Sequence, residues 1–441
     1  MATRVTVIGA GLSGSEAALQ LAVRGVPVDL YEMRPTVPTE AHQTDRLAEI
    51  VCSNSFKSMS GTHASGLLKE EMKALGSFLI PIAEECRVEA GTALAVDRDQ
   101  FAEAVTRRVT AQANITVHRE ELRDLPKEGP VIVATGPLTS AALTESLTRF
   151  LDLGELYFYD STAPIVSAES IDRDIAFEAN RRDAGVGHYL NCPFTEEQYL
   201  AFHEALLAAE KYPLHDFEKA TFFEACLPID ELAARGPKTL CFGPMRPIGL
   251  IDPATGRRPH AVVQLRAENR AGTAFNLVGC QNRMRHGDQK RVLRMIPGLE
   301  RAEFYRLGRI HRNTYLNAPK VLDPFLAVER EPRVSLAGQI TGLEGYVEAV
   351  ATGMLAGQFT AARLRNERLD RFPRESALGS LMEFVSGYEG KEYRPTNVNF
   401  GLFPPLEERL RKGPERNAAI TERARAAMTD WLARHPTHVF S

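Results

Sequence analysis

The sequence lacks the segments that mark a membrane or secreted protein. None of its apolar runs approaches the length of about eighteen residues that a membrane-spanning helix needs. The first residues, MATRVTVIGAG, form a strand pattern that runs directly into a glycine turn, without the charged start, apolar middle and cleavage site of a signal peptide. Internal repeats and low-complexity tracts are also missing. We therefore expect a cytoplasmic protein that does not contact a membrane.

Cysteine is scarce, and its spacing excludes two kinds of site. There is no CxxC pair and no metal-ligand spacing among the six cysteines: Cys52, Cys86, Cys192, Cys226, Cys241 and Cys280. In a cytoplasmic chain this pattern argues against a disulfide framework and against zinc, so we expect no metal. Each cysteine is then either a small buried hydrophobic residue, which is the more common case, or a reactive thiol.

A basic excess is missing as well. Lysine and arginine number 53 against 57 acidic residues, which gives a net charge of −4, whereas dedicated nucleic-acid-binding proteins are usually basic. Contact with RNA must then come from a local patch. The densest cationic stretch comprises Arg283, Arg285, Lys290, Arg291 and Arg294. These side chains are candidates for neutralising RNA phosphates, and a solvated helix face is the alternative.

What the sequence does contain is a βαβ pattern at its start. A β-branched run at 4–9 is followed by a helical pattern at 14–24, a glycine stop at Gly25 and a second strand at 26–32. Similar strands ending in small residues lie at 130–136 and 334–338, the latter followed by a helix at roughly 345–365. Strands of one kind that lie so far apart predict a single sheet interrupted by an insertion.

The intervening stretch has a different character. A hairpin is expected at 260–266 and 274–280, with amphipathic helices at 195–210 and 287–295, and a charged helix at 410–435. The prediction is an α/β fold: a Rossmann-like domain with an inserted α+β domain. The first section of the Rossmann-like domain is expected at 1–160, the insertion, on the substrate side, at 161–310, and the second section with a C-terminal helical tail at 311–441.

The glycine turn has the spacing of a dinucleotide site. Gly9 permits the tight turn, Gly11 lets the backbone approach a pyrophosphate, and Gly14 allows close helix–sheet packing. Glu32 ends the second strand at a distance that suits a carboxylate bonded to ribose hydroxyls. The motif alone does not separate FAD from NAD, but the ending Ala134-Thr135-Gly136 recurs in FAD proteins of glutathione-reductase type, so we expect the Rossmann-like domain to be an FAD-binding domain of this type. The expected cofactor-binding residues are Gly9, Ala10, Gly11, Leu12, Ser13, Gly14, Glu32, Thr135, Gly136, Gly338 and Gly345.

Two cysteines lie in unusual surroundings. Cys52 directly precedes Ser53 and Asn54, which are good N-cap residues, and a helix beginning there would favour its thiolate. Cys226 lies among aromatic and acidic neighbours in FFEACLP. From spacing alone, a buried structural cysteine is an equal alternative for Cys52 and the favoured one for Cys226. The other four have no such context, and we expect them to be structural.

Long blocks of the chain resemble one family, the folate- and FAD-dependent tRNA (uracil-5-)-methyltransferases, which are related to the flavin-dependent tRNA-modifying proteins of the GidA type. The resemblance runs from residue 5 to about 410. The blocks that carry it are GAGLSGSEAA, AEIVCSNS, GLLKEEM, ALAVDRDQF, ATGPLTS, YLNCPFTEEQY, FFEACLPIDELA, GPMRPIGL, VVQLRAEN, MIPGLE, HRNTYLNAP and GYVEAVATG.

The resemblance implies a reaction and its residues. Such enzymes methylate C5 of the T-loop uridine (position 54) of tRNA, with 5,10-methylenetetrahydrofolate as one-carbon donor and FAD reduced by NAD(P)H. Cys226 matches the nucleophile and Cys52 the proton acceptor, although the two roles could be exchanged. By family position His286 is a platform for the pterin, with Phe217 as a weaker candidate. For His286 a solvent-exposed loop histidine is an equal alternative.

Two other functions stay open at this stage. An FAD oxidoreductase acting on a small molecule fits the acidic net charge, but the two cysteine-bearing blocks oppose it. A non-catalytic flavin-binding partner of another tRNA-modifying enzyme would tolerate the loss of both Cys52 and Cys226. Transfer of labelled carbon to tRNA would separate the methyltransferase from the oxidoreductase.

Overall fold

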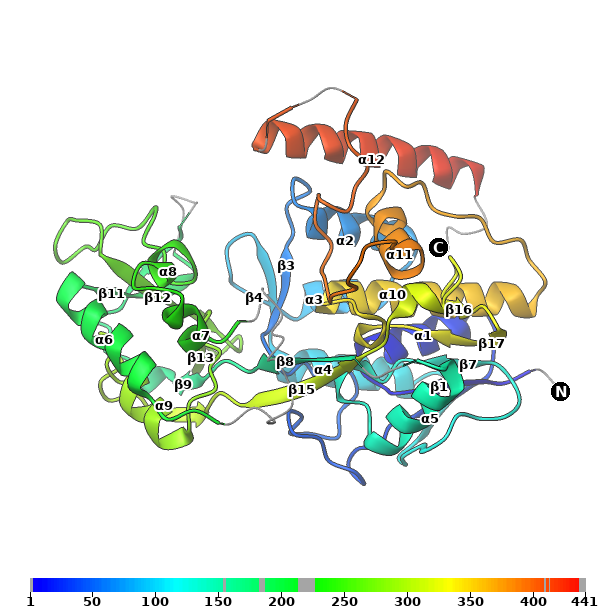
Figure 1. Ribbon diagram of the computed structural model, residues 1–441, viewed down its shortest axis with the longest axis horizontal. Helices are drawn as coiled ribbons and strands as arrows, with labels where there is room; N and C mark the ends of the chain where they lie inside the picture. Colours follow the sequence, from blue (N-terminus) through cyan, green and yellow to red (C-terminus); the bar gives the residue numbers. More distant parts are fainter. Residues whose placement is uncertain are drawn as a thin grey trace.

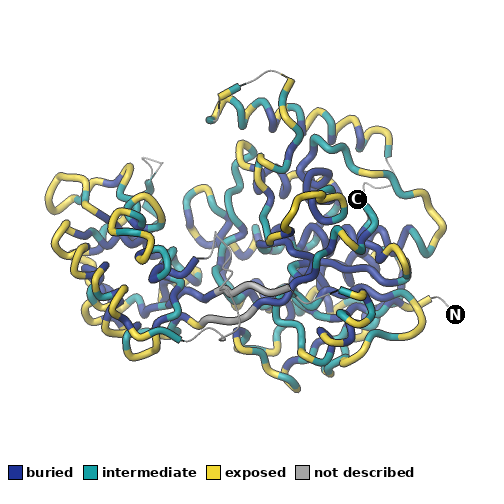
Figure 2. The backbone as a smooth tube through the Cα atoms, viewed as in Figure 1, coloured by how far each residue is buried: buried dark blue, intermediate teal, exposed yellow. Residues whose placement is uncertain are grey.

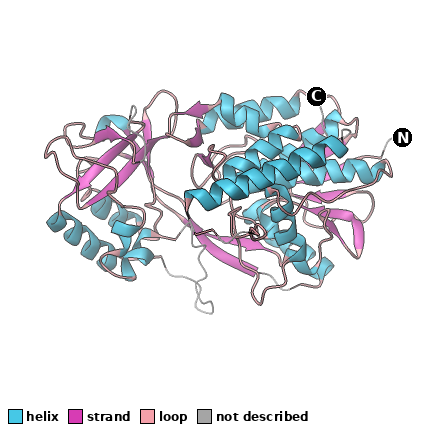
Figure 3. Ribbon diagram, turned by 90° about the horizontal axis from the view of Figure 1, so that it is seen from above, coloured by secondary structure: helices cyan, strands magenta, loops and turns pink. Residues whose placement is uncertain are grey.

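A computed structural model gives the fold of the chain (Figure 1). It describes residues 3–153, 156–181, 187–212, 227–407, 410–411 and 413–435. Two lobes lie along the long axis, and the long helices cover one of them (Figure 3). Among the described residues, no helix combines the length and the apolar character that crossing a membrane requires.

The larger lobe is organised by a six-stranded sheet with the order β16-β17-β7-β1-β2-β6. Every neighbouring pair except β16–β17 is parallel. The strands are β1 (Val5–Ile8), β2 (Val28–Tyr31), β6 (Ile115–His118), β7 (Val131–Val133), β16 (Ala327–Val328) and β17 (Glu331–Leu336). The first four come from the start of the chain and the last two from beyond residue 320. This arrangement confirms the predicted α/β fold.

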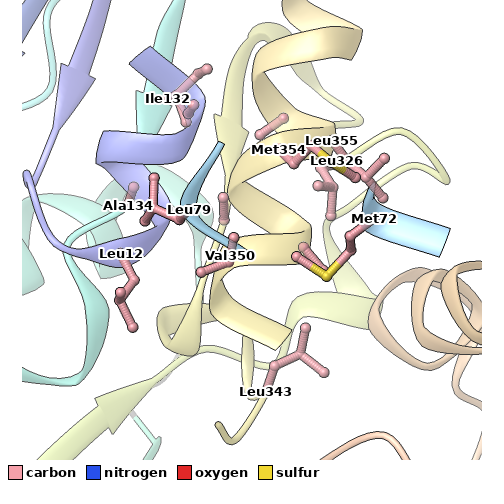
Figure 4. Packing of buried hydrophobic residues seen from close by; sticks show 14 of the residues in the cluster. Leu12, Met72, Leu79, Ile132, Ala134, Leu326, Leu343, Val350, Met354 and Leu355 are labelled. Atoms are coloured by element: carbon pink, nitrogen blue, oxygen red, sulfur yellow. The ribbon is translucent and has the colours of Figure 1, made fainter. Parts of the chain in front are cut away.

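Two helices of distant sequence pack tightly beside this sheet. They are α1 (Leu12–Val23) and α10 (Tyr346–Leu364). A Cβ on Gly353 would lie 2.1 Å from the Ser13 carbonyl oxygen, and one on Gly357 would lie 2.7 Å from the Ala17 carbonyl oxygen. The two glycines therefore let the backbone of α10 touch that of α1. Apolar side chains of α10, among them Val350 and Met354, belong to the buried core of this lobe (Figure 4).

The remaining elements of this lobe surround the same core. The small antiparallel sheet has the order β3-β5-β4, with β3 (Ser55–Ser58), β4 (Arg87–Val88) and β5 (Ala93–Val96). Short 3₁₀ turns, η1 (Gly136–Leu138) and η5 (Gln339–Thr341), follow β7 and β17. The helices are α2 (Ala64–Ala74), α3 (Leu79–Glu85), α4 (Arg98–Thr110), α5 (Ala141–Leu151), α11 (Ala377–Gly387) and α12 (Pro414–Arg434).

The smaller lobe has its own antiparallel sheet and its own core. The sheet order is β10-β11-β12-β13-β9-β14. Its strands are β9 (Ile165–Ser167), β10 (Phe177–Ala179), β11 (Tyr189–Phe194), β12 (Ala261–Ala267), β13 (Ala274–Leu277) and β14 (Phe304–Arg306). Its helices are α6 (Glu196–Ala208), α7 (Ile229–Ala234), α8 (Thr239–Phe242) and α9 (His286–Leu293). A two-stranded ribbon, β8 (Leu156–Ser161) with β15 (Ile310–Tyr315), runs between the lobes (Figure 1). The domain boundaries at 160 and 310 stay a prediction.

One local expectation is wrong. The residues after Cys52 do not begin a helix, because Ser55 pairs with Ala95 and the chain enters β3 instead. Asn54 does not cap a helix either. Its amide donates to the carbonyl oxygens of Val96 and Ala267, which lie far away in the sequence.

Candidate functional site

A cleft lies at the ends of β1, β2 and β7. The structure brings seven predicted residues to its wall: Gly9, Gly11, Leu12, Ser13, Glu32, Thr135 and Gly136. Ala10, Gly14, Gly338 and Gly345 are not part of the wall, although Gln339 and Tyr346 beside the last two are.

Glycine is required at the three motif positions for different structural reasons. Gly9 has φ +94°, and its Cβ would lie 2.7 Å from the Ala134 carbonyl oxygen. A Cβ on Gly14 would lie 1.8 Å from the Gly9 carbonyl oxygen. Gly11 differs, because its φ of −71° suits any residue and a Cβ there would meet no protein atom within 4 Å. Gly11 lines the cleft without a side chain, so a bound ligand, rather than a protein atom, would exclude a larger residue at this position.

The start of α1 is also suited to an anion. Ser13 is 4% exposed, and within the described part of the chain its hydroxyl has no hydrogen-bond partner. No side chain caps the helix at Gly11, and its first turn holds no acidic residue. Free N–H groups, the helix dipole and an unpaired hydroxyl at the cleft wall fit a pyrophosphate. Behind them, Gly338 adopts φ +81° and its missing Cβ leaves room for Ser13.

Glu32 is fixed at the end of β2. Its Oε2 accepts a hydrogen bond of 3.3 Å from the Ala10 amide, and its Oε1 lies 2.9 Å from Nε of the buried Arg34. Burial raises the pKa of Glu32, but the Arg34 guanidinium outweighs it and holds the pKa below its ordinary value. Arg34 also pairs with Glu49 at 3.0 Å, and both line the cleft. A charged carboxylate therefore lines the cleft at the position where the sequence predicts the ribose of a dinucleotide.

Cys52 lies beside the same cleft. Val51, which precedes Cys52 in the chain, and Tyr346 form part of the cleft wall. The Tyr346 hydroxyl accepts hydrogen bonds from the backbone amides of Cys52 at 2.9 Å and Ser53 at 3.2 Å. The thiol itself donates to the Ser161 carbonyl oxygen at 3.6 Å. A residue at the start of α10 thus holds the backbone of the segment that carries this thiol beside the cleft.

Two arginines hold the carbonyl oxygens of the segment that carries this thiol. Arg98 donates to Ile50 at 2.7 Å and to Cys52 at 3.5 Å, and Arg306 donates to Val51 at 2.8 Å. Burial lowers the pKa of Arg306 to about 10. Arg98 comes from α4 of the larger lobe and Arg306 from β14 of the smaller one. Both lobes therefore fix the position of Cys52.

The chain matches the protein-family model described as Glucose inhibited division protein A over residues 4–368. It is 53% identical to "Methylenetetrahydrofolate--tRNA-(uracil-5-)-methyltransferase TrmFO" of Exiguobacterium sibiricum, covering 97% of this chain and 99% of that one. The protein of the same name from Enterococcus faecalis is 52% identical, with 96% and 97% covered. The chain belongs to the TrmFO family. Among solved structures, Aquifex aeolicus GidA has the same fold, with a TM-score of 0.71, 16% identity, and 100% of this chain and 74% of that chain covered.

The second predicted catalytic cysteine, Cys226, lies outside the described residues, as does Phe217. The four cysteines expected to be structural are buried or half-buried. Burial raises the pKa of the thiols of Cys192, Cys241 and Cys86, and that of Cys280 to about 12, which disfavours the thiolate in each. Among the residues that the structure describes, no cluster of three or more potential ligands could hold a metal ion.

The structure places His286 and the cations of 283–294 away from the cleft wall. His286 begins α9, is exposed and stands edge-on to Tyr212 with ring centres 6.1 Å apart. Most of the cations have intramolecular partners. Arg283 pairs with Glu231, Arg285 with Glu210 and Arg291 with Asp288, while Arg294 donates to the Ala302 carbonyl oxygen and Lys290 is exposed. Their predicted roles toward folate and tRNA stay predictions.

Sequence reasoning missed Arg34, Tyr346 and the arginine pair Arg98–Arg306. No motif marks these residues. Tyr346, Arg98 and Arg306 contact a segment that is distant in the sequence. Arg34 pairs with Glu32, and the spacing of the motif does not predict which residue pairs with that acid. Tyr346 alone had a weak signal, since it follows Gly345 directly in the block GYVEAVATG.

Proposed function

We propose that this chain methylates C5 of a uridine in tRNA, with 5,10-methylenetetrahydrofolate as the one-carbon donor and NAD(P)H as the reductant of its FAD. The observation that carries the proposal is the juxtaposition of a dinucleotide cleft with Cys52, whose segment is bonded to the cleft residue Tyr346. The names of the relatives support the same substrates. We assign the reaction to the uridine of the T-loop, and we infer that the enzyme recognises the T-arm of the tRNA. We also infer that it acts in the cytoplasm.

The cofactor role of the cleft follows from its residues. Gly11 would admit the pyrophosphate, Ser13 would donate its hydroxyl to it, and Glu32 would accept hydrogen bonds from a ribose. When bound, FAD supplies the reducing equivalents and carries the one-carbon unit. The protein contributes a fixed charge at Glu32 and a polar helix start that need no rearrangement on binding.

The uracil chemistry requires a nucleophile and a base. C5 of uracil is a weak nucleophile until a thiolate forms a bond to C6, and we assign this addition to Cys226. The enolate then attacks the one-carbon unit through C5. We assign removal of the C5 proton to the Cys52 thiolate, after which the electron pair left at C5 would break the bond between the one-carbon unit and its carrier nitrogen. A hydride, which bound FAD would supply, would then convert the resulting methylene group to methyl as the Cys226 sulfur leaves C6. The reverse division of roles has the same balance of atoms and electrons.

The test is product formation by the purified full chain. An unmodified tRNA transcript, methylenetetrahydrofolate and NAD(P)H should yield ribothymidine at the T-loop position, with label transferred from the folate methylene group. NAD(P)H oxidation without ribothymidine would favour an oxidoreductase acting on a small molecule. If neither product nor oxidation is seen, a flavin-binding partner protein becomes the better assignment.

A further inference from the structure

The segment 238–260 of the smaller lobe, called here the 238–260 surface, combines exposed apolar side chains with unpaired positive charge. Phe242 at the end of α8 is 78% exposed, and Ile248 and Ile251 in the following loop are 55% and 59% exposed. They are among the most exposed large apolar residues that the structure describes. The α8 region lies at the far end of the molecule from the N-terminus, and the loops there are largely exposed (Figures 1 and 2).

The charge of this surface is uncompensated. It carries four cations, Lys238, Arg246, Arg257 and Arg258, against a single acid, Asp252. Asp252 is occupied by its own turn, where its carboxylate accepts from the Ala254 amide at 2.9 Å and the Thr255 hydroxyl at 3.1 Å. Within the described residues none of the four cations forms an ion pair, and the buried Nε of Arg246 has no hydrogen-bond partner.

This pattern contrasts with the cationic stretch on α9. There Arg283, Arg285 and Arg291 are already paired with carboxylates, so a phosphate would have to compete with an existing partner. Arg257 and Arg258 form no ion pair with any residue that the structure describes, so a phosphate would displace no carboxylate there. In Figure 1, α8 lies at the top of the smaller lobe and α9 at the bottom, so the two regions are separate candidates for RNA contact.

We infer that the 238–260 surface docks tRNA, with Arg257 and Arg258 on phosphates and Phe242 stacked on an exposed base. The inference rests on the proposed function. Arginines position an RNA backbone through phosphate contacts, and exposed aromatic rings bind unpaired bases by stacking. In the chain only α7 and short connections separate this surface from the predicted nucleophile Cys226. A second copy of the chain fits less well, because a two-fold interface would place the same unpaired cations against one another.

The test compares matched charge reversals in the FAD-loaded full chain. The variant Arg257→Glu/Arg258→Glu should raise the Kd for an unmodified tRNA transcript about tenfold or more at moderate salt. It should also flatten the slope of log K against log salt by about one unit for each lost contact. Phe242→Ser should raise Kd by about tenfold with no change of slope, because stacking releases no counterions.

Two controls carry the same change of charge. Arg107→Glu/Arg108→Glu alters an exposed arginine pair on α4 of the other lobe and should leave Kd and slope unchanged. Arg291→Glu/Arg294→Glu tests α9 directly and should have the smaller effect. Unchanged flavin content and unfolding temperature show that each variant is folded.

The inference is overturned if Arg257→Glu/Arg258→Glu binds tRNA as tightly as the wild type, or if the α9 or α4 variant loses more. It is also overturned if sedimentation shows that this variant disrupts a dimer while its tRNA affinity is unchanged. These results differ from failure of the proposed function, in which the wild-type protein itself forms no ribothymidine. With the inference correct, the variant raises KM for tRNA and leaves kcat at saturating tRNA nearly unchanged.

Discussion

The hydroxyl of Tyr346 accepts a hydrogen bond of 2.9 Å from the backbone amide of Cys52. The two residues lie almost 300 positions apart, and the bond joins the start of α10 to the segment that carries the thiol. Because Tyr346 also lines the cleft, one residue connects the predicted cofactor site to the segment that carries Cys52. Burial raises the pKa of Tyr346 well above its ordinary value, so the hydroxyl stays neutral.

The first prediction concerns this bond. Tyr346→Phe leaves the amides of Cys52 and Ser53 without their acceptor, so the thiol segment should lose its fixed position. We expect retained FAD, a loss of about 1–3 kcal/mol in unfolding free energy, and methyl transfer reduced by one order of magnitude or more. Tyr199→Phe is the matched control, because its hydroxyl donates to Pro237 in the other lobe. Equal activity of the two variants would contradict a positioning role for Tyr346.

The second prediction separates reactive from structural cysteines. Cys52→Ala and Cys226→Ala should each keep FAD and lose methyl transfer by several orders of magnitude, because one lacks the base and the other the nucleophile. Cys86→Ala and Cys241→Ala should stay active, with a packing cost of roughly 1 kcal/mol. Ribothymidine formation measured under single-turnover conditions tells the pairs apart. The assignment would be refuted if Cys86→Ala or Cys241→Ala abolished methyl transfer while Cys52→Ala retained it.

The third prediction uses the difference between two motif glycines. Gly11→Val should fold, since nothing lies within 4 Å of the new Cβ, but it should not bind the cofactor because the side chain enters the cleft. Gly14→Val should fail to fold, because its Cβ would overlap the Gly9 carbonyl oxygen. The wild-type protein should be yellow and release FAD rather than FMN on denaturation. Normal flavin content in folded Gly11→Val would remove the basis of the cofactor assignment.

The fourth prediction concerns the pH dependence of stability. Lys69 is buried and donates to the carbonyl oxygens of Phe56 and Ser65, and burial lowers its pKa to about 8. Below pH 8 the amine is charged in both the folded and the unfolded state. Between pH 8 and its ordinary value near 10.5 the folded state has released the proton while the unfolded state keeps it. Stability should therefore rise with pH across this window.

Denaturant unfolding at pH 7.5 and at pH 10 measures this effect. The rise attributable to Lys69 amounts to about 3 kcal/mol at most. Lys69→Met should lose that part of the rise whatever its absolute stability, because the remaining groups titrate as before. An unchanged difference between the two pH values would show that Lys69 titrates in the folded state as it does in the unfolded one.

The sequence by itself predicted the dinucleotide cleft and the sheet around it. Gly9, Gly11, Gly14 and the distant Glu32 belong to one βαβ unit, where each spacing is set by local backbone geometry. The helices predicted from periodicity are present at nearly the expected residues, because an amphipathic pattern repeats at each turn whatever lies against it.

Only the tertiary structure showed what surrounds Cys52. Ser53 and Asn54 have good N-cap side chains, but pairing with β5 draws the chain into a strand, and Asn54 bonds instead to Val96 and Ala267. Tyr346, Arg98 and Arg306 reach the same segment from α10, α4 and β14. Such contacts depend on how elements distant in the sequence pack together, and no local pattern records them. The thiol is therefore visible in the sequence, while its position beside the cleft is decided by non-local packing.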